Sequence, residues 1–181
     1  ILRIYEKKKK RKEEIRMASA GAGYDLSPTT FSPDGRIFQV SYAQKSVSTS
    51  GTSLGILCSD GVVLACEKLK NSKMLLPSSG RRLHSVGAGY ACAVTGFASD
   101  GRQIVNRARE EVSSYKDTYG ILPPPSVLAD RLGHYVHYFT LHGALRPFGA
   151  TATVASYDSD MKECKLHQID PSGTCHSYYA C

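Results

Sequence analysis

Three residues in the first quarter of the chain, Tyr24, Asp25 and Tyr42, carry groups that can recognise a partner. A tyrosine phenol can donate a hydrogen bond to a carboxylate, and Pro33 adds a rigid apolar surface for ring packing. Pro33 lies in Ser-Pro-Asp-Gly at 32–35, residue types that favour a tight reverse turn. The pattern predicts an ordered N-terminal recognition segment. The alternative is that these are ordinary turn and core residues.

The cysteines and histidines do not have the spacing of a metal site. The chain has six of each and no Cys-x-x-Cys pair, whereas a zinc or redox site needs close, convergent ligands. His134 and His137 are one helical turn apart, but such a pair more often serves packing or contacts solvent. We expect free thiols, no metal ion and no other cofactor.

The net charge of +7 is concentrated at one end of the 181-residue chain. Residues 1–16 hold five lysines, three arginines and three glutamates, a net charge of +5, which leaves +2 for the rest. We interpret 1–16 as a basic extension that is disordered or not native, with Met17 as the true start. A localisation signal or nucleic-acid-binding arm is the alternative. No apolar run approaches a membrane span of roughly 18 residues, so we predict an intracellular protein without a membrane partner.

Hydrophobic periodicity predicts the helices that position the N-terminal segment. Val40, Ala43 and Val47 share one face of a short helix that ends at 48–51, with Asp34 as a plausible N-cap. A second helix is expected from about 100 to 119, stopped by Gly120. A third is capped by Ser126 and broken at 146–149.

Alternating apolar runs between turn residues predict strands on both sides of the two long helices. Asp-Gly at 60–61 is a strong hairpin signal. The order of hairpins, two helices and further hairpins predicts an α+β fold with antiparallel sheets and helices outside. Because 178–181 reads as strand, we expect a truncated product. The expected strands are 52–58, 62–66, 82–86, 90–95, 150–156, 164–169 and 174 onward.

Several motifs, in order along 17–181, resemble those of proteasome α-type subunits. The first two are Tyr-Asp-Leu-Ser at 24–27 and Thr-Phe-Ser-Pro-Asp-Gly-Arg at 30–36, which are most similar to the eukaryotic type-3 branch. Further matching motifs are Phe-Gln-Val-x-Tyr-Ala at 38–43, Asp-Gly-Val-Val at 60–63, Ala-Arg-Glu-Glu at 108–111, 135–141, Arg-Pro-Phe-Gly at 146–149 and Ile-Asp-Pro-Ser-Gly at 169–173.

The resemblance implies a four-layer α-β-β-α sandwich of the N-terminal-nucleophile hydrolase type, incomplete at the C-terminus. It divides the chain into the extension at 1–16, a gate segment and first helix at 17–50, and a partial sandwich domain at 51–181. It also implies a non-catalytic subunit of the 20S core in the cytoplasm and nucleus. The implied partners are other α subunits, β-ring subunits and regulatory particles, with no specific nucleic acid.

The catalytic residues of active relatives do not map onto this chain. Active members use an N-terminal threonine as nucleophile, and the resemblance places Gly51 at that position. Thr52 is one residue out of register, which in a strand points its side chain to the opposite face. Arg82 stands where the active-site lysine would be, and a guanidinium stays protonated. Glu67 lies near the acidic position without a nucleophile to serve.

The resemblance assigns two binding roles instead. Tyr24, Asp25, Pro33 and Tyr42 match the gate cluster, while Leu26 and Ser41 depart from the family's usual arginine and acidic residue. The predicted activator-docking residues are Pro33, Gly35 and Arg82. Of these, Arg82 aligns with a lysine that binds the tail carboxylate in the family. The alternative is that Arg82 is a solvated surface charge.

Two other functions remain open from the sequence alone. One is a threonine hydrolase that processes itself at Gly51-Thr52. The other is a nucleic-acid-binding protein that acts through its basic arm, with steeply salt-dependent affinity.

Overall fold

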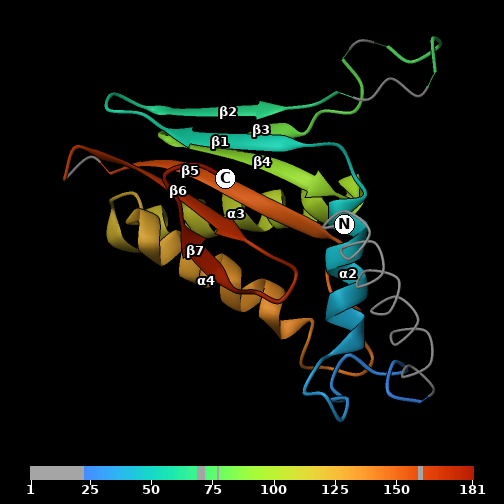
Figure 1. Ribbon diagram of the computed structural model, residues 1–181. Helices are drawn as coiled ribbons and strands as arrows, with labels where there is room; N and C mark the ends of the chain where they lie inside the picture. The colour runs from blue at the N-terminus through green and yellow to red at the C-terminus, as the bar shows by residue number, and fades with distance from the viewer. Residues whose placement is uncertain (1–22, 69–71, 77, 159–160) are drawn as a thin grey trace, which may run out of the picture.

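Two antiparallel sheets and three helices make up the part of the chain that the computed structural model describes, residues 23–68, 72–76, 78–158 and 161–181 (Figure 1). The predicted basic extension at 1–16 lies outside these residues. The elements, in chain order, are α2 (Phe38–Ser48), β1 (Ser53–Leu57), β2 (Val62–Cys66), β3 (Leu83–Gly87), β4 (Tyr90–Gly96), α3 (Ala98–Tyr119), α4 (Pro125–Tyr138), β5 (Ala150–Asp158), β6 (Glu163–Ile169) and β7 (Cys175–Ser177).

Every predicted strand is found, and six of the seven have ends within about two residues of the prediction. The seventh, expected to run from 174 to the end of the chain, stops at Ser177, so the prediction of strand at 178–181 is wrong; beyond β7 only Ala180 forms an isolated bridge, to Ile56. The Asp60-Gly61 hairpin joins β1 to β2, in a register that pairs Leu57 with Val62. The second sheet has the order β3-β4-β5-β6-β7, and every neighbouring pair is antiparallel. Backbone hydrogen bonds of Tyr179 and Cys181 with β1 then attach the last residues to the first sheet.

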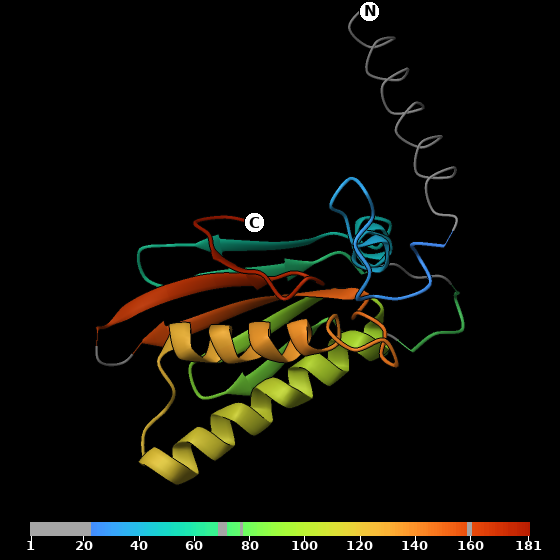
Figure 2. The ribbon, with the colours of Figure 1, turned by 90° about the horizontal axis from the view of Figure 1, so that it is seen from below.

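The two sheets and the pair α3 and α4 are stacked as three layers (Figures 1 and 2). Gly55 of β1 has the side chains of Leu166 and Thr153 against it, so the sheets approach closely where a glycine leaves room. On its other face, the five-stranded sheet is covered by the two long helices. Helix α2 contacts β4 and β5 at one end of the stack. The α+β class is confirmed.

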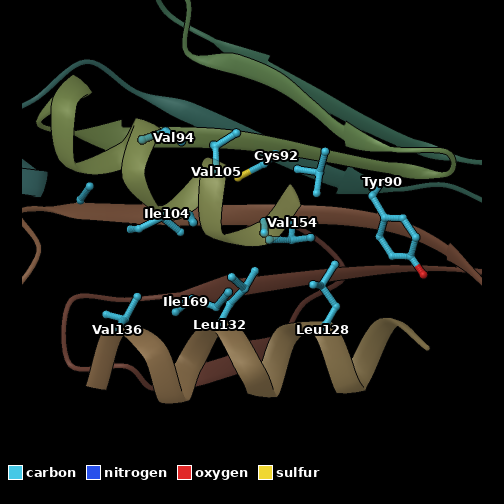
Figure 3. Close-up of a cluster of buried hydrophobic side chains, with 14 of the residues drawn as sticks. Tyr90, Cys92, Val94, Ile104, Val105, Leu128, Leu132, Val136, Val154 and Ile169 are labelled. Atoms are coloured by element: carbon cyan, nitrogen blue, oxygen red, sulfur yellow. The ribbon is translucent and has the colours of Figure 1, made fainter. Parts of the chain in front are cut away.

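The hydrophobic core lies between the five-stranded sheet and the two long helices (Figure 3). Leu128, Leu132 and Val136 recur at the four-residue spacing that keeps them on one face of α4. Ile104 of α3 and Ile169 of β6 complete the contact. Because these side chains are almost fully buried, the hydrophobic effect fixes both helices on the sheet.

Both predicted N-caps are wrong. Helix α2 begins after Ile37 without a side-chain cap, because Asp34 is held in the preceding turn. Helix α4 begins at Pro125, so Ser126 lies one residue inside it. Proline is favoured at the first helical position because its φ is already helical and its missing N–H would be unpaired there.

The predicted end of α3 is confirmed and that of α4 is wrong. Gly120 terminates α3 with φ of 75°, a left-handed conformation that glycine adopts without strain. Helix α4 ends at Tyr138 rather than at 146–149. There, the N–H and the hydroxyl of Thr140 both donate to the carbonyl of His137, at 2.8 and 2.7 Å, and turn the chain away.

Candidate functional site

The Ser-Pro-Asp-Gly turn forms as predicted and immediately precedes α2. The N–H of Gly35 donates to the carbonyl of Ser32 at 2.8 Å, and Gly35 has φ of 73°. The N–H of Arg36 also donates to the hydroxyl of Ser32 at 3.0 Å. Pro33 and Gly35 are exposed at the tip of the turn. The turn is therefore a stiff feature that is exposed at the surface.

Asp25 connects this N-terminal segment to the first two turns of α2. The hydroxyl of Tyr42 donates to a carboxylate oxygen of Asp25 at 3.5 Å, and the side-chain amide of Gln39 donates to the Asp25 carbonyl. Partial burial and the charge of Asp25 raise the pKa of Tyr42. Phe38 stacks on Tyr42 with ring centroids 6.2 Å apart. The segment before the turn is thus fastened to α2.

Of the other two predicted gate residues, Pro33 lies in the turn, and Tyr24 makes no hydrogen bond within the described residues. Leu26 and Ser41, where the chain departs from the family's usual residues, are also outside this contact: Leu26 is 85% exposed. Ser41 donates to the carbonyl of Ile37 at 3.3 Å, as a serine inside a helix often does. The sequence did not single out Gln39, whose partner lies fourteen residues away in the chain.

Arg82 lies at the other end of α2 and connects β4 to the residues just before β1 and just after β2. Its guanidinium donates to the carbonyls of Gly51 at 2.6 Å, Val94 at 3.0 Å and Glu67 at 3.2 Å. These bonds leave Arg82 half-buried. The alternative of a freely solvated surface charge is therefore wrong.

Gly51 and Thr52 lie just before β1 and have different hydrogen-bond partners. Gly51 is beside Arg82, where the resemblance places nucleophile and lysine. Thr52 instead pairs with Glu67: its N–H donates to the Glu67 carboxylate at 3.1 Å, and its carbonyl accepts the Glu67 N–H at 2.8 Å. The Thr52 nitrogen is an amide within the chain, so it cannot act as the free amine that an N-terminal nucleophile requires.

A cavity of about 410 Å³ opens beside Arg82. Its walls include Leu75, Leu76, Val94 and Ala98, so much of the lining is apolar, and Lys68 and Arg81 also line it beside Arg82. The cavity and the turn at 32–35 are at opposite ends of the 11-residue helix α2. At 1.5 Å per residue they are separated by about 16 Å.

Two family models match the chain. One describes proteasome subunits in general and matches residues 47–181, and the other describes the N-terminal signature of A-type proteasome subunits and matches residues 24–45. The chain belongs to the proteasome subunit family. The second match covers the segment that contains Asp25, the turn and Tyr42, and it identifies the chain as α-type.

The matched relatives include α-type subunits from plants and from an insect. The chain is 52% identical over 163 residues to the proteasome alpha type-3 subunit of Spinacia oleracea and 53% identical to that of Oryza sativa. It is 42% identical to the alpha type-3 subunit of Drosophila melanogaster. The alignments cover 90–91% of this chain and 65% of each relative, so the chain spans just under two thirds of their length. The predicted resemblance to type-3 α subunits is confirmed.

The described residues of this proteasome chain contain neither a metal site nor a disulfide. Among them, no group of three histidine, cysteine, aspartate or glutamate side chains could hold a metal ion. All six cysteines are free, and burial raises the pKa of Cys92 to about 12, as expected for an unreactive core thiol. No helix in this part of the chain is long and apolar enough to cross a membrane.

Proposed function

We propose that this chain is a non-catalytic subunit of the α ring of the 20S proteasome. In this role it contributes to ring assembly, to the gate for substrate entry and to the docking of regulators in ubiquitin-dependent protein degradation. The observation that carries the proposal is that the α-type signature at 24–45 coincides with the segment that Asp25 fastens to α2.

The absence of peptidase activity is supported by Gly51 and Arg82. Gly51 has no hydroxyl to act as a nucleophile, and its carbonyl accepts a hydrogen bond from Arg82. A guanidinium cannot exchange a proton at neutral pH, so Arg82 cannot activate a nucleophile as a lysine does. Thr52 has a hydroxyl, but its amide is held by Glu67. The self-processing hydrolase is therefore the weaker alternative.

The gate role is proposed for Tyr24, Asp25, Pro33 and Tyr42. The Asp25–Tyr42 contact would fix where the N-terminal segment leaves the body of the protein, and Pro33 would stiffen the turn beside it. Tyr24 is 41% exposed and has the freedom to pack against a neighbouring subunit. With Leu26 in place of the family's usual arginine, no salt bridge can come from that position.

The docking role requires two neighbouring subunits. Pro33 and Gly35 are separated from Arg82 by the whole of α2, so one chain cannot present both to the same short tail. We propose that the turn of one subunit, together with the Arg82 cavity of the next, forms one pocket. Arg82 uses three of its five N–H donors within its own chain, which leaves two for a tail carboxylate.

The full four-layer sandwich is also a proposal. The three described layers leave the outer face of β1 and β2 uncovered, and Leu54, Ile56 and Val63 on this face are 52%, 47% and 55% exposed. A contiguous apolar sheet face normally packs against another layer. We propose that helices cover it in the assembled protein. The proposed partners are α-type and β-type subunits and regulators with C-terminal tails, in the cytoplasm and nucleus.

Assembly tests the proposal directly. The full chain is co-expressed with the α-type subunits of a relative, and the complexes are examined by native mass spectrometry. We expect this chain to enter ring complexes with its mass intact and without reaction with an electrophilic threonine-protease inhibitor. A chain that is excluded from every complex would refute the ring role, and a mass that starts at Thr52 would favour the hydrolase.

A further inference from the structure

A basic groove lies between the turn at 78–81, strand β3 and the first half of α3. It encloses about 440 Å³ and is lined by Arg81, His84, Arg102, Arg109, Asn106 and Ser79, with Ser78, Gly80 and Val105. No described residue that lines it is acidic. Three guanidinium groups thus converge on one hollow without a carboxylate to balance them.

Two of the three arginines are available to a ligand. Arg81 and Arg102 are exposed, and neither side chain makes a hydrogen bond or ion pair with any described residue. By contrast, Arg107 and Arg131 on the neighbouring face of α3 and α4 are both paired with Glu111. The charges in the groove are therefore unpaired where nearby arginines are neutralised.

The third arginine gives the groove a fixed wall. Arg109 donates from Nε and Nη2 to the carbonyl of Ser85, at 3.0 and 2.8 Å, and from Nη1 to Oδ1 of Asn106 at 3.3 Å. Burial and then the charge of Arg109 lower the pKa of His84, with lesser contributions from the charges of Arg102 and Arg81, while a hydrogen bond to the Arg81 backbone opposes them. Burial and, after it, the arginine charges thus both disfavour a proton on His84.

We propose that the basic groove binds the carboxylate side chains of an acidic protein segment. Arginine matches a carboxylate geometrically, since its planar fork can donate two parallel hydrogen bonds. The groove shares Ser79, Gly80, Arg81 and His84 with the neighbouring cavity, whose walls include Leu75, Leu76, Val94 and Ala98. A protein segment with an apolar side chain beside its carboxylates can fill the groove and the neighbouring cavity together. A nucleic acid or a free phosphate would leave the apolar side chains of that cavity uncovered.

This inference goes beyond the docking role proposed above. That role concerns the terminal carboxylate of a tail at Arg82, whereas the basic groove takes side-chain carboxylates and needs no chain end. A probe whose two ends are blocked separates the two ideas, because it cannot present a terminal carboxylate to Arg82.

The test measures binding of a short peptide, acetylated and amidated at its ends, that carries several glutamates beside leucine. Fluorescence anisotropy is recorded with the full 181-residue chain and with its Arg81→Gln/Arg102→Gln variant. We expect the variant to bind roughly tenfold more weakly, since it loses two charge-assisted contacts. Affinity should also fall as ionic strength rises.

The matched control is Lys116→Gln, which removes one positive charge from the exposed far end of α3. It should bind the peptide with the affinity of the parent chain. Any binding by the basic residues at 1–16 is the same in all variants, so it does not affect the comparison. Equal binding by the parent and the double variant would overturn the proposal, as would equal affinity for a peptide with glutamine in place of glutamate. Orthophosphate or single-stranded DNA that binds through Arg81 and Arg102 while the peptide does not would also overturn it.

Discussion

The carboxylate of buried Asp100 accepts two hydrogen bonds from the guanidinium of Arg146, at 2.6 and 2.8 Å. A third comes from the N–H of Gly149 at 2.8 Å. Asp100 lies in the first turn of α3, and Arg146 lies in the connection before β5. One buried acid thus fixes the chain where it re-enters the sheet.

Removal of this carboxylate should destabilise the fold. Asp100→Ala leaves the N–H of Gly149 without its partner and the guanidinium of Arg146 without its counter-charge. We expect a loss of about 2–4 kcal/mol in the free energy of unfolding, measured by urea denaturation. Asp117→Ala removes an exposed acid from the same helix and should change the free energy by less than about 0.5 kcal/mol. Similar effects of both variants would mean that the contact contributes little.

The same contact predicts a dependence of stability on acid. The hydrogen bonds from Arg146, with a smaller contribution from Gly149, hold the pKa of Asp100 below its ordinary value although burial opposes them. The contribution to stability is therefore complete above the ordinary pKa and is lost as pH falls through the lower folded-state pKa. Below about pH 4, Asp100→Asn should lose less stability than the parent chain. Parallel curves for the two proteins would refute this.

His167 should make the protein less stable in mildly acidic solution. Its Nδ1 is buried without a partner among the described residues, and burial, with the charge of Lys165, lowers its pKa against a smaller effect of Asp130. Since the unfolded chain binds the proton more readily, stability should fall as pH drops below about 6.5. The urea midpoint of His167→Gln should therefore decrease less with falling pH than that of the parent chain. Some decrease should remain, because the pKa of His84 is also lowered. Exposed His176→Gln is the control.

Gly101 is required where α3 meets β4. A Cβ at Gly101 would lie 1.9 Å from Cγ1 of Val94, and a β-branched side chain has little freedom to move aside. We expect Gly101→Ala to cost about 1–3 kcal/mol in unfolding free energy. The double variant Gly101→Ala/Val94→Ala should show favourable coupling between the two sites. Strictly additive effects would contradict the close contact.

Arg82 should matter for stability before any ligand binds. Arg82→Ala leaves the carbonyls of Gly51, Glu67 and Val94 without this donor, so we expect a loss of about 1–3 kcal/mol. Arg81→Ala removes the next side chain along, which makes no hydrogen bond or ion pair with the described residues, and should change stability by less than about 0.5 kcal/mol. Thermal melting of the two variants compares them. An Arg82 variant as stable as the Arg81 variant would mean that these three hydrogen bonds contribute little to stability.

Tyr42→Phe tests the gate proposal apart from stability. The hydroxyl makes one long, exposed hydrogen bond to Asp25, so its loss should cost less than about 1 kcal/mol. In assembled particles, the freed N-terminal segment should increase basal hydrolysis of a small fluorogenic peptide. The control is Tyr119→Phe, at an exposed tyrosine of α3. Unchanged hydrolysis in correctly assembled particles would remove Tyr42 from the gate.

The sequence by itself determined the elements and the character of the nucleophile position. Local geometry makes Asp60-Gly61 a hairpin turn. The four-residue spacing of Leu128, Leu132 and Val136 determines which face of their helix is buried. These are properties of a short stretch of chain. The missing hydroxyl of Gly51 is likewise readable without a structure.

Only the tertiary structure decided which polar groups meet. Asp100 and Arg146 are 46 residues apart, and Arg82 reaches carbonyls up to 31 residues away. No periodicity encodes such pairs, because they depend on how β1, β4 and α3 stack. The caps expected at Asp34 and Ser126 failed for a local reason instead: the turn at 32–35 and the prolines at 124–125 set where each helix begins. Unpaired charge in the basic groove is also a tertiary property, since it exists only where β3 and α3 bring separate arginines together.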